Sequence, residues 1–160
     1  MNFVVHQSGS LSVFLREERE TLELGARLAR VLQPRLKIYL RGQLGAGKTT
    51  LVRGLLRGLG YAGTVRSPTY ALVEVYSFSS LYLHHFDFYR FKHPAEWDDA
   101  GFRDIFGGNS VCLVEWPEKV GELLPMADLE IVLEHEASGR TVHLRAHTET
   151  GMQCLQRLIA

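Results

Sequence analysis

The chain has 160 residues, of which 46% are hydrophobic and 22% charged, a composition typical of one folded globular domain covering residues 1–160. Its 18 basic and 18 acidic side chains cancel, which excludes a global positive field that would draw the protein to nucleic acid or to an anionic membrane. No apolar run approaches the roughly 20 residues of a membrane span and no secretion signal is evident, so a cytoplasmic protein is expected.

The first half of the chain alternates between strand and helix patterns. Residues 2–6 predict a short strand, and residues 16–32 an amphipathic helix. The apolar stripe of that helix is expected to contain Leu15, Leu22, Leu24, Leu28 and Val31. Residues 36–40 then predict a strand and residues 48–59 a second helix, with glycines between them. The order strand, glycine loop, helix favours parallel strands at the centre of an α/β domain.

The second half of the chain is rich in strand patterns, which cover residues 71–78, 81–88, 111–114, 129–134 and 141–146. Short serine-containing segments separate the first two and the last two of these, which favours antiparallel hairpins. Residues 94–106 and 153–159 have a helical composition. The sequence therefore predicts an α/β fold with a mixed, P-loop NTPase-like sheet flanked by helices.

Residues 42–49 read Gly-Gln-Leu-Gly-Ala-Gly-Lys-Thr and match the phosphate-binding pattern GxxxxGK[ST] without a mismatch. Glycines permit backbone angles that turn N–H groups toward phosphate, and the positive end of the next helix adds to the attraction. Lys48 would reach the β- and γ-phosphates, and the Thr49 hydroxyl would ligate Mg²⁺. The nucleotide site would be completed by Gly45, Ala46, Gly47 and Thr50. A glycine-rich turn without a ligand is the alternative.

Hydrolysis also needs carboxylates near the phosphates. Glu115 ends the apolar run 111–114, so it could hold Mg²⁺ from the carboxyl end of a buried strand; the alternative is an acid at an exposed strand end. Asp87, at the end of another strand pattern, could orient the attacking water or hold Mg²⁺. His84 and His85 precede it, but adjacent residues on a strand point to opposite faces, which argues against a shared metal.

Thr69 lies in a Ser-Pro-Thr segment after the phosphate-loop helix, where switch loops commonly meet the γ-phosphate. Thr69 could therefore contact Mg²⁺ or that phosphate. A turn set by Pro68 and capped by a hydroxyl explains the same residues.

These segments together resemble the bacterial TsaE (YjeE) family over nearly the whole chain. Residues 21–29 match its T-x-x-L-G-x-x-L-A pattern, and the phosphate loop matches through Thr50. The other matching segments are V-x-S-P-T-[FY] at 65–70, H-F-D-x-Y-R at 85–90, E-W-P at 115–117 and G-R at 139–140. The ordered set is more specific than a phosphate loop alone.

The resemblance implies a weak, Mg²⁺-dependent ATPase that acts with the TsaB and TsaD proteins. That pair forms N6-threonylcarbamoyladenosine at position 37 of tRNAs that read ANN codons, so tRNA would be met indirectly, and no membrane is involved. By matching motif, Lys48, Thr69, Asp87 and Glu115 become the catalytic candidates, with Thr49 and Glu115 at the metal. Trp116 becomes a candidate for packing near the nucleotide or a partner, against a core aromatic as the alternative. The resemblance also places Glu17 and Glu18 near the base.

Gln43 departs from the family pattern, which usually has Asp at this second position of the loop. The phosphate contacts use the backbone and Lys48, so nucleotide binding is expected to survive, while any role of the Asp in a charge network or partner docking stays open. No guanine signature N-K-x-D is present, which favours ATP. Two other functions are weighed: a small-molecule kinase, although no Arg-rich lid segment follows Val120, and a nucleotide-regulated interaction module with little turnover.

Overall fold

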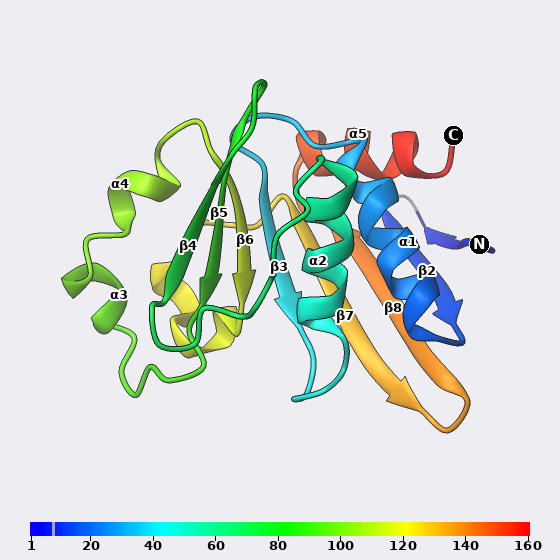
Figure 1. Ribbon diagram of the computed structural model, residues 1–160, viewed down its shortest axis with the longest axis horizontal. Helices are drawn as coiled ribbons and strands as arrows, with labels where there is room; N and C mark the ends of the chain where they lie inside the picture. The colour runs from blue at the N-terminus through cyan, green and yellow to red at the C-terminus, as the bar shows by residue number, and fades with distance from the viewer. Residues whose placement is uncertain (8) are drawn as a thin grey trace.

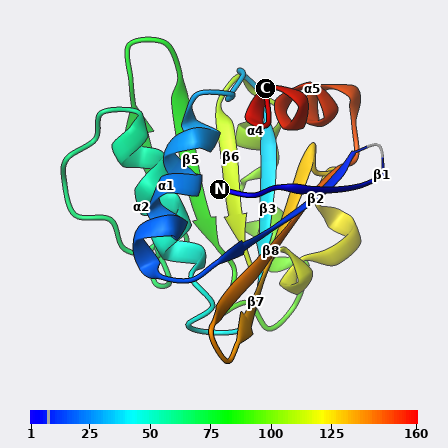
Figure 2. The same cartoon turned by 90° about the vertical axis from the view of Figure 1, so that its right-hand side faces the viewer.

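The computed structural model describes residues 1–7 and 9–160, and within these residues eight strands form one mixed sheet. The order across the sheet is β1-β2-β8-β7-β3-β6-β5-β4 (Figures 1 and 2). The strands are β1 Val4–Gln7, β2 Ser10–Leu15, β3 Lys37–Arg41, β4 Val73–Ser77, β5 Tyr82–Asp87, β6 Val111–Glu115, β7 Leu129–Glu136 and β8 Gly139–Ala146.

The centre of the sheet is parallel and its flanks are antiparallel. β3 pairs in parallel with both β6 and β7, and β6 pairs in parallel with β5. The hairpins β4–β5 and β7–β8 are antiparallel, as are the pairings of β2 with β8 and with β1. The predicted mixed sheet with hairpins added to a parallel core is therefore confirmed.

Two helices, α1 (Glu18–Ala29) and α2 (Lys48–Gly58), lie side by side on one face of the sheet, as Figures 1 and 2 show. Short helices α3 (Glu96–Asp99) and α4 (Arg103–Phe106) follow β5, and α5 (Glu149–Leu158) ends the chain. Two 3-10 turns, η1 (Pro117–Lys119) and η2 (Gly121–Leu123), follow β6. Among the described residues, no helix is both long and apolar enough to cross a bilayer.

The two faces of the sheet carry different cores. Alternation along β6 sends Val111 and Leu113 into an aliphatic cluster that includes Leu51 and Leu55 of α2. Cys112 and Val114 point the other way, into a largely aromatic cluster. The aromatic members of the second cluster are Tyr39, Phe86, Phe88, Phe91, Trp97, Phe102 and Phe106. The fully apolar run of β6 is thus explained by burial on both faces.

Three sequence predictions need correction. β2 was not expected, and Leu15 belongs to this strand rather than to the helix stripe, where Leu22 is half-buried. The single helical segment over 94–106 is two short helices, because the chain turns at Gly101, whose φ is 75°. The last helix begins at Glu149 instead of residue 153, because the Thr148 hydroxyl accepts the Gly151 N–H and caps it.

The parallel pairing brings the functional candidates to one edge. Leu40, the residue before the end of β3, is level with Glu115 at the end of β6, and Glu115 is level with Asp87 at the end of β5. The phosphate loop follows β3 directly. In an open α/β sheet the crevice beyond the carboxyl ends of the strands is where ligands bind.

Candidate nucleotide site

A cavity of about 360 Å³ lies at this edge, between the phosphate loop and the ends of β5 and β6. Of the residues predicted for the site, its walls include Gly45, Gly47, Lys48, Thr49, Thr50, Thr69, Asp87 and Glu115. Ala46 is not among the lining residues; it is buried, and its N–H donates to the Gln43 carbonyl at 3.0 Å. Because this loop contact uses backbone atoms, Gln43 in place of Asp leaves the turn intact.

The backbone of the loop needs its glycines. Gly45 and Gly47 have φ values of 80° and 110°, in the region that L side chains rarely adopt. A Cβ on Gly47 would also overlap the guanidinium of Arg140. No side chain within the described residues caps the N-terminus of α2, and its first three residues, Lys48, Thr49 and Thr50, line the cavity, so the positive end of the helix dipole lies at the cavity wall. This arrangement suits phosphate oxygens.

Lys48 is 5% exposed and is held by two contacts within the protein. Its Nζ donates to the Gly42 carbonyl and lies 3.8 Å from the centroid of the Trp116 ring. Burial lowers the pKa of Lys48 from its ordinary value, while the carboxylates of Glu115, Glu118 and Asp87 partly oppose that shift. Trp116 has a left-handed backbone, with φ 59°, and packs against Tyr89 with ring centroids 5.0 Å apart. Trp116 lines the cavity, and its partly buried ring also packs against the aromatic cluster of the core.

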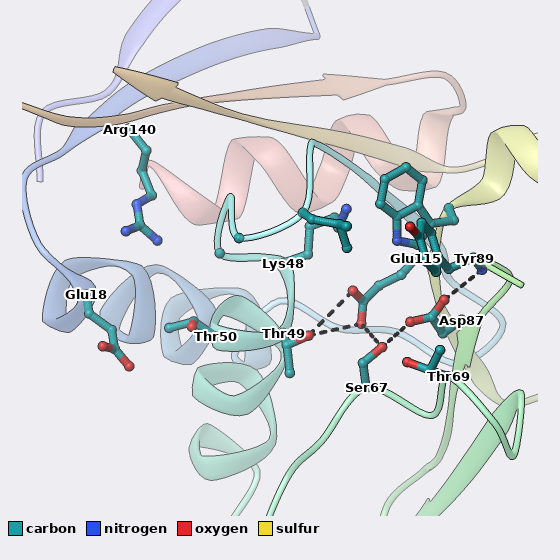
Figure 3. Close-up of a pocket in the computed structure, with 14 residues that line it drawn as sticks. Glu18, Lys48, Thr49, Thr50, Ser67, Thr69, Asp87, Tyr89, Glu115 and Arg140 are labelled. Carbon is teal, nitrogen blue, oxygen red and sulfur yellow. Dashed lines mark hydrogen bonds between the residues drawn. The ribbon is translucent and has the colours of Figure 1, made fainter. Parts of the chain in front are cut away.

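Glu115 and Asp87 lie side by side and are 2% and 3% exposed, which rules out an exposed strand-end acid. The Ser67 hydroxyl joins them: it donates to Asp87 Oδ2 and lies 3.2 Å from Glu115 Oε2 (Figure 3). The Thr49 hydroxyl is 3.5 Å from each Glu115 oxygen. The Tyr89 N–H donates to Asp87 Oδ1 at 2.8 Å.

The donor set fits Mg²⁺ bound together with a nucleotide. Two neighbouring buried carboxylates repel each other, and a divalent cation offsets that repulsion. Carboxylate and hydroxyl oxygens are ligands that Mg²⁺ prefers, usually one or two from the protein with the rest from phosphate and water. In the described part of the chain, no three His, Cys, Asp or Glu side chains gather to hold an ion by themselves.

Four lining residues, Leu44, Ser67, Tyr89 and Arg140, were given no role in the sequence predictions. Ser67 was quoted within its motif, but Thr69 was emphasised instead. Arg140 belongs to the G-R pair and lines the cavity with a buried Nε that has no partner within the described residues. Glu18, which the resemblance placed near the base, also lines the cavity, whereas Glu17 is not among the lining residues. Figure 3 places Arg140, Glu18 and Thr50 at one end of the cavity, and Asp87, Glu115 and Thr69 at the other.

The two adjacent histidines diverge as β5 requires. His85 is fully buried, and its Nε2 lies 2.7 Å from Glu115 Oε2. His84 faces the other way and stacks on Phe86, with ring centroids 6.1 Å apart. Burial lowers the pKa of His84. The contact between His85 and Glu115 was not anticipated from the sequence, because it joins residues 30 apart in the chain.

Comparison with known families decides the relationship. Residues 15–142 match the family model described as "Threonylcarbamoyl adenosine biosynthesis protein TsaE". The chain belongs to the TsaE family. It is 41% identical over 147 residues to the "tRNA threonylcarbamoyladenosine biosynthesis protein TsaE" of Haemophilus influenzae, covering 89% of this chain and 93% of that protein. The protein of the same name from Bacillus subtilis is 39% identical over 115 residues, 72% of each chain.

A solved structure supports the same relationship. The crystal structure of Bacillus subtilis YdiB superposes with a TM-score of 0.82 at 29% sequence identity, covering 97% of each chain. The α/β fold with its phosphate loop is therefore that of the family. Neither alternative, a small-molecule kinase or an interaction module with little turnover, is favoured by these relationships.

Proposed function

We propose that the protein binds ATP with Mg²⁺ and hydrolyses it slowly, and that this activity supports the TsaB–TsaD pair in forming N6-threonylcarbamoyladenosine at position 37 of tRNAs that read ANN codons. The observation that carries the proposal is the phosphate loop facing two buried carboxylates, Asp87 and Glu115, joined by Ser67. Family membership supports the biological role. The neutral net charge favours indirect contact with tRNA, through the partners.

The phosphate loop and the start of α2 would bind the phosphates. Backbone N–H groups from Gly45 to Thr50 would surround the phosphate oxygens, and Lys48 would exchange its contacts with Gly42 and Trp116 for the β- and γ-phosphates. Arg140, with its unpartnered Nε, would add positive charge at the end of the cavity near Thr50. We place the base at the same end, beside Glu18.

Hydrolysis would take place at the other end of the cavity, beside Asp87 and Glu115. Bound Mg²⁺ supplies charge neutralisation on the phosphates. Thr49 and Glu115 would hold it, and the Asp87 carboxylate would accept the proton of the attacking water. The water oxygen bonds to the γ-phosphorus as the bond to the β–γ bridging oxygen breaks, which releases ADP. Thr69, on the wall near Asp87, would contact the γ-phosphate as a switch residue.

The test is ATP binding by calorimetry, with and without Mg²⁺, for the wild type and for Lys48→Ala. The variant loses a charge-assisted phosphate contact worth about 1.5–3 kcal/mol, so ATP affinity is expected to fall about 10- to 100-fold. Lys37→Ala is the matched control, because Lys37 lies at the opposite end of β3, where its Nζ donates to the Arg35 carbonyl at 3.0 Å. Equal ATP affinity for the wild type and Lys48→Ala would reject the nucleotide site.

A further inference from the structure

His85 lies one rung deeper than the two carboxylates, on the same face of the sheet. It stands two residues before Asp87 on β5, and β5–β6 pairing places it level with Leu113, two residues before Glu115. From there its ring reaches diagonally to Glu115 Oε2, at 2.7 Å. The side chain is fully buried and does not line the nucleotide cavity. It can therefore reach a nucleotide or metal only through Glu115.

The hydrogen bond fixes which ring nitrogen carries the proton. A carboxylate oxygen only accepts, so Nε2 must donate. Nδ1 is buried and has no hydrogen-bond partner within the described residues. The ring is thus oriented with one donor, aimed at Glu115.

The hydrogen bond from His85 gives the two Glu115 oxygens different surroundings. Oε2 lies 2.7 Å from His85 Nε2 and 3.2 Å from the Ser67 hydroxyl, and the Thr49 hydroxyl lies 3.5 Å from both Oε2 and Oε1. Because His85 holds Oε2, rotation of the carboxylate is restricted, and the Glu115 carboxylate stays beside the Thr49 hydroxyl. An apolar side chain at position 85, beside Leu83 and Leu113, would pack in the same core but would not restrict rotation of the Glu115 carboxylate.

We propose that His85 is a positioning residue that holds the Glu115 carboxylate toward Thr49 and so sets the affinity of the site for the divalent cation of the nucleotide complex. This inference rests on the proposed function, in which Thr49 and Glu115 hold that cation. Hydrogen-bond partners behind a metal ligand commonly change metal affinity 10- to 100-fold when removed. His85 thereby acts on the metal step without contacting ATP.

The experiment uses Mn²⁺ as the probe, with its binding to the protein–ADP complex followed by electron paramagnetic resonance. His85→Leu is expected to weaken Mn²⁺ binding about tenfold or more, with ADP affinity measured without divalent metal unchanged. His85→Gln places an amide donor at a similar distance from the backbone and should restore most of the affinity. His85→Asn is too short to reach Glu115 and should resemble His85→Leu. The Gln and Asn pair decides the matter if His85→Leu does not fold.

His84→Leu is the matched control, because His84 is the neighbouring residue on the opposite face of β5, and wild-type Mn²⁺ affinity is expected. The Glu115→Gln variant tests the metal role of Glu115 separately from the positioning role of His85. If it weakens Mn²⁺ binding while His85→Leu and His85→Asn do not, the positioning role is wrong and the metal role of Glu115 stands. If Glu115→Gln binds Mn²⁺ like the wild type, the metal role of Glu115 is wrong and the inference falls with it.

Discussion

At the scale of single residues, Lys48 is stabilised within the protein before any ligand arrives. Its ammonium donates a hydrogen bond to the Gly42 carbonyl and makes a cation–π contact with the Trp116 ring, while burial removes much of its hydration. A cation over an indole ring contributes about 0.5–2 kcal/mol. Phosphate must therefore replace two contacts, and the net gain from Lys48 is the difference between the two environments. This competition tempers nucleotide affinity.

Asp87→Asn is predicted to suppress hydrolysis while leaving ATP binding largely intact. The amide keeps the size of the side chain and an oxygen for the Tyr89 N–H, but it cannot take a proton from water. Loss of a general base typically costs about 10²–10⁴-fold in rate, so kcat should fall by that order. Phosphate release and ATP affinity are measured in parallel.

Asp104→Asn serves as the control for that change, since Asp104 is exposed in α4. If Asp87→Asn hydrolysed ATP at the wild-type rate, Asp87 would have no role in the chemical step. A lowered thermal transition together with lost ATP binding would show instead that Asp87 is needed for the local fold around Ser67.

Motifs located the residues whose role depends on local spacing. Lys48 and Thr49 follow from the phosphate loop itself, and Glu115 from an apolar strand that ends in an acid. His85 and Arg140 lie in segments that match the family, but those segments do not indicate their contacts, because the contacts join residues far apart in the chain. Their placement depends on strand register and on the β7–β8 hairpin, which single-sequence patterns do not specify.

At the scale of elements, the contact between α1 and α2 depends on glycine. A Cβ on Gly25 would lie 2.6 Å from the Leu55 nitrogen, and one on Gly54 would lie 2.8 Å from the Leu22 Cα. Both neighbours are backbone atoms, which cannot move aside by a rotamer change. The two helices therefore approach more closely than any other side chain would allow, and α2 carries Lys48 and Thr49 at its start.

Gly54→Ala is accordingly predicted to destabilise the protein, although alanine favours helix by up to about 1 kcal/mol over glycine. Overpacking of this kind typically costs about 1–3 kcal/mol, and backbone overlap should outweigh the propensity gain. Urea unfolding measures the change. Gly107→Ala is the matched control, because its Cβ would meet nothing closer than 3.6 Å. A Gly54→Ala variant more stable than the wild type would contradict the close contact.

Glu96→Gln tests the start of α3 through pH. The Glu96 carboxylate accepts the backbone N–H groups of His93 and Lys92, at 2.9 and 2.6 Å, and these bonds lower its pKa. A lowered pKa in the folded state means that the carboxylate stabilises the fold above its ordinary pKa of about 4.5, and that this contribution is lost as pH falls through the lowered value.

Thermal unfolding of Glu96→Gln should therefore show a lower transition than the wild type at pH 7, with the difference shrinking as the solution becomes more acid than pH 4.5. Glu122→Gln, on an exposed side chain of η2, is the comparison. A difference that is the same at pH 7 and in acid would show that the charge of Glu96 makes no contribution.

The helices and strands were predicted correctly where the hydrophobic period of the sequence was clear. The predictions failed where tertiary contacts determine where an element begins or ends. The core strands, both hairpins and α2 were found because alternation, apolar runs and glycines mark them. β2 was missed because Phe14, 39% exposed, interrupts a simple apolar pattern and Leu15 also fits a helix stripe. The break between α3 and α4 depends on Gly101 and on aromatic packing, with Trp97 and Phe106 in edge contact at 5.5 Å.

At the scale of the whole molecule, one sheet places four functional segments at a single edge. β3 delivers the phosphate loop, β5 delivers Asp87, and β6 delivers Glu115 and Trp116, while the β7–β8 hairpin brings Arg140 behind Gly47. The sheet is continuous from β1 to β4. This continuity supports the expectation of one domain, which stays a prediction.

The proposed role, ATP hydrolysis in this cavity in support of a tRNA-modifying complex, can be measured with the purified protein. Its ATP hydrolysis is followed alone and with TsaB, TsaD and tRNA, and the Lys48→Ala variant is measured in the same way. We expect slow hydrolysis by the protein alone, a higher rate with the partners, and loss of both rates in the variant. A rate that is indifferent to Lys48, or to the partners and tRNA, would contradict the proposed role.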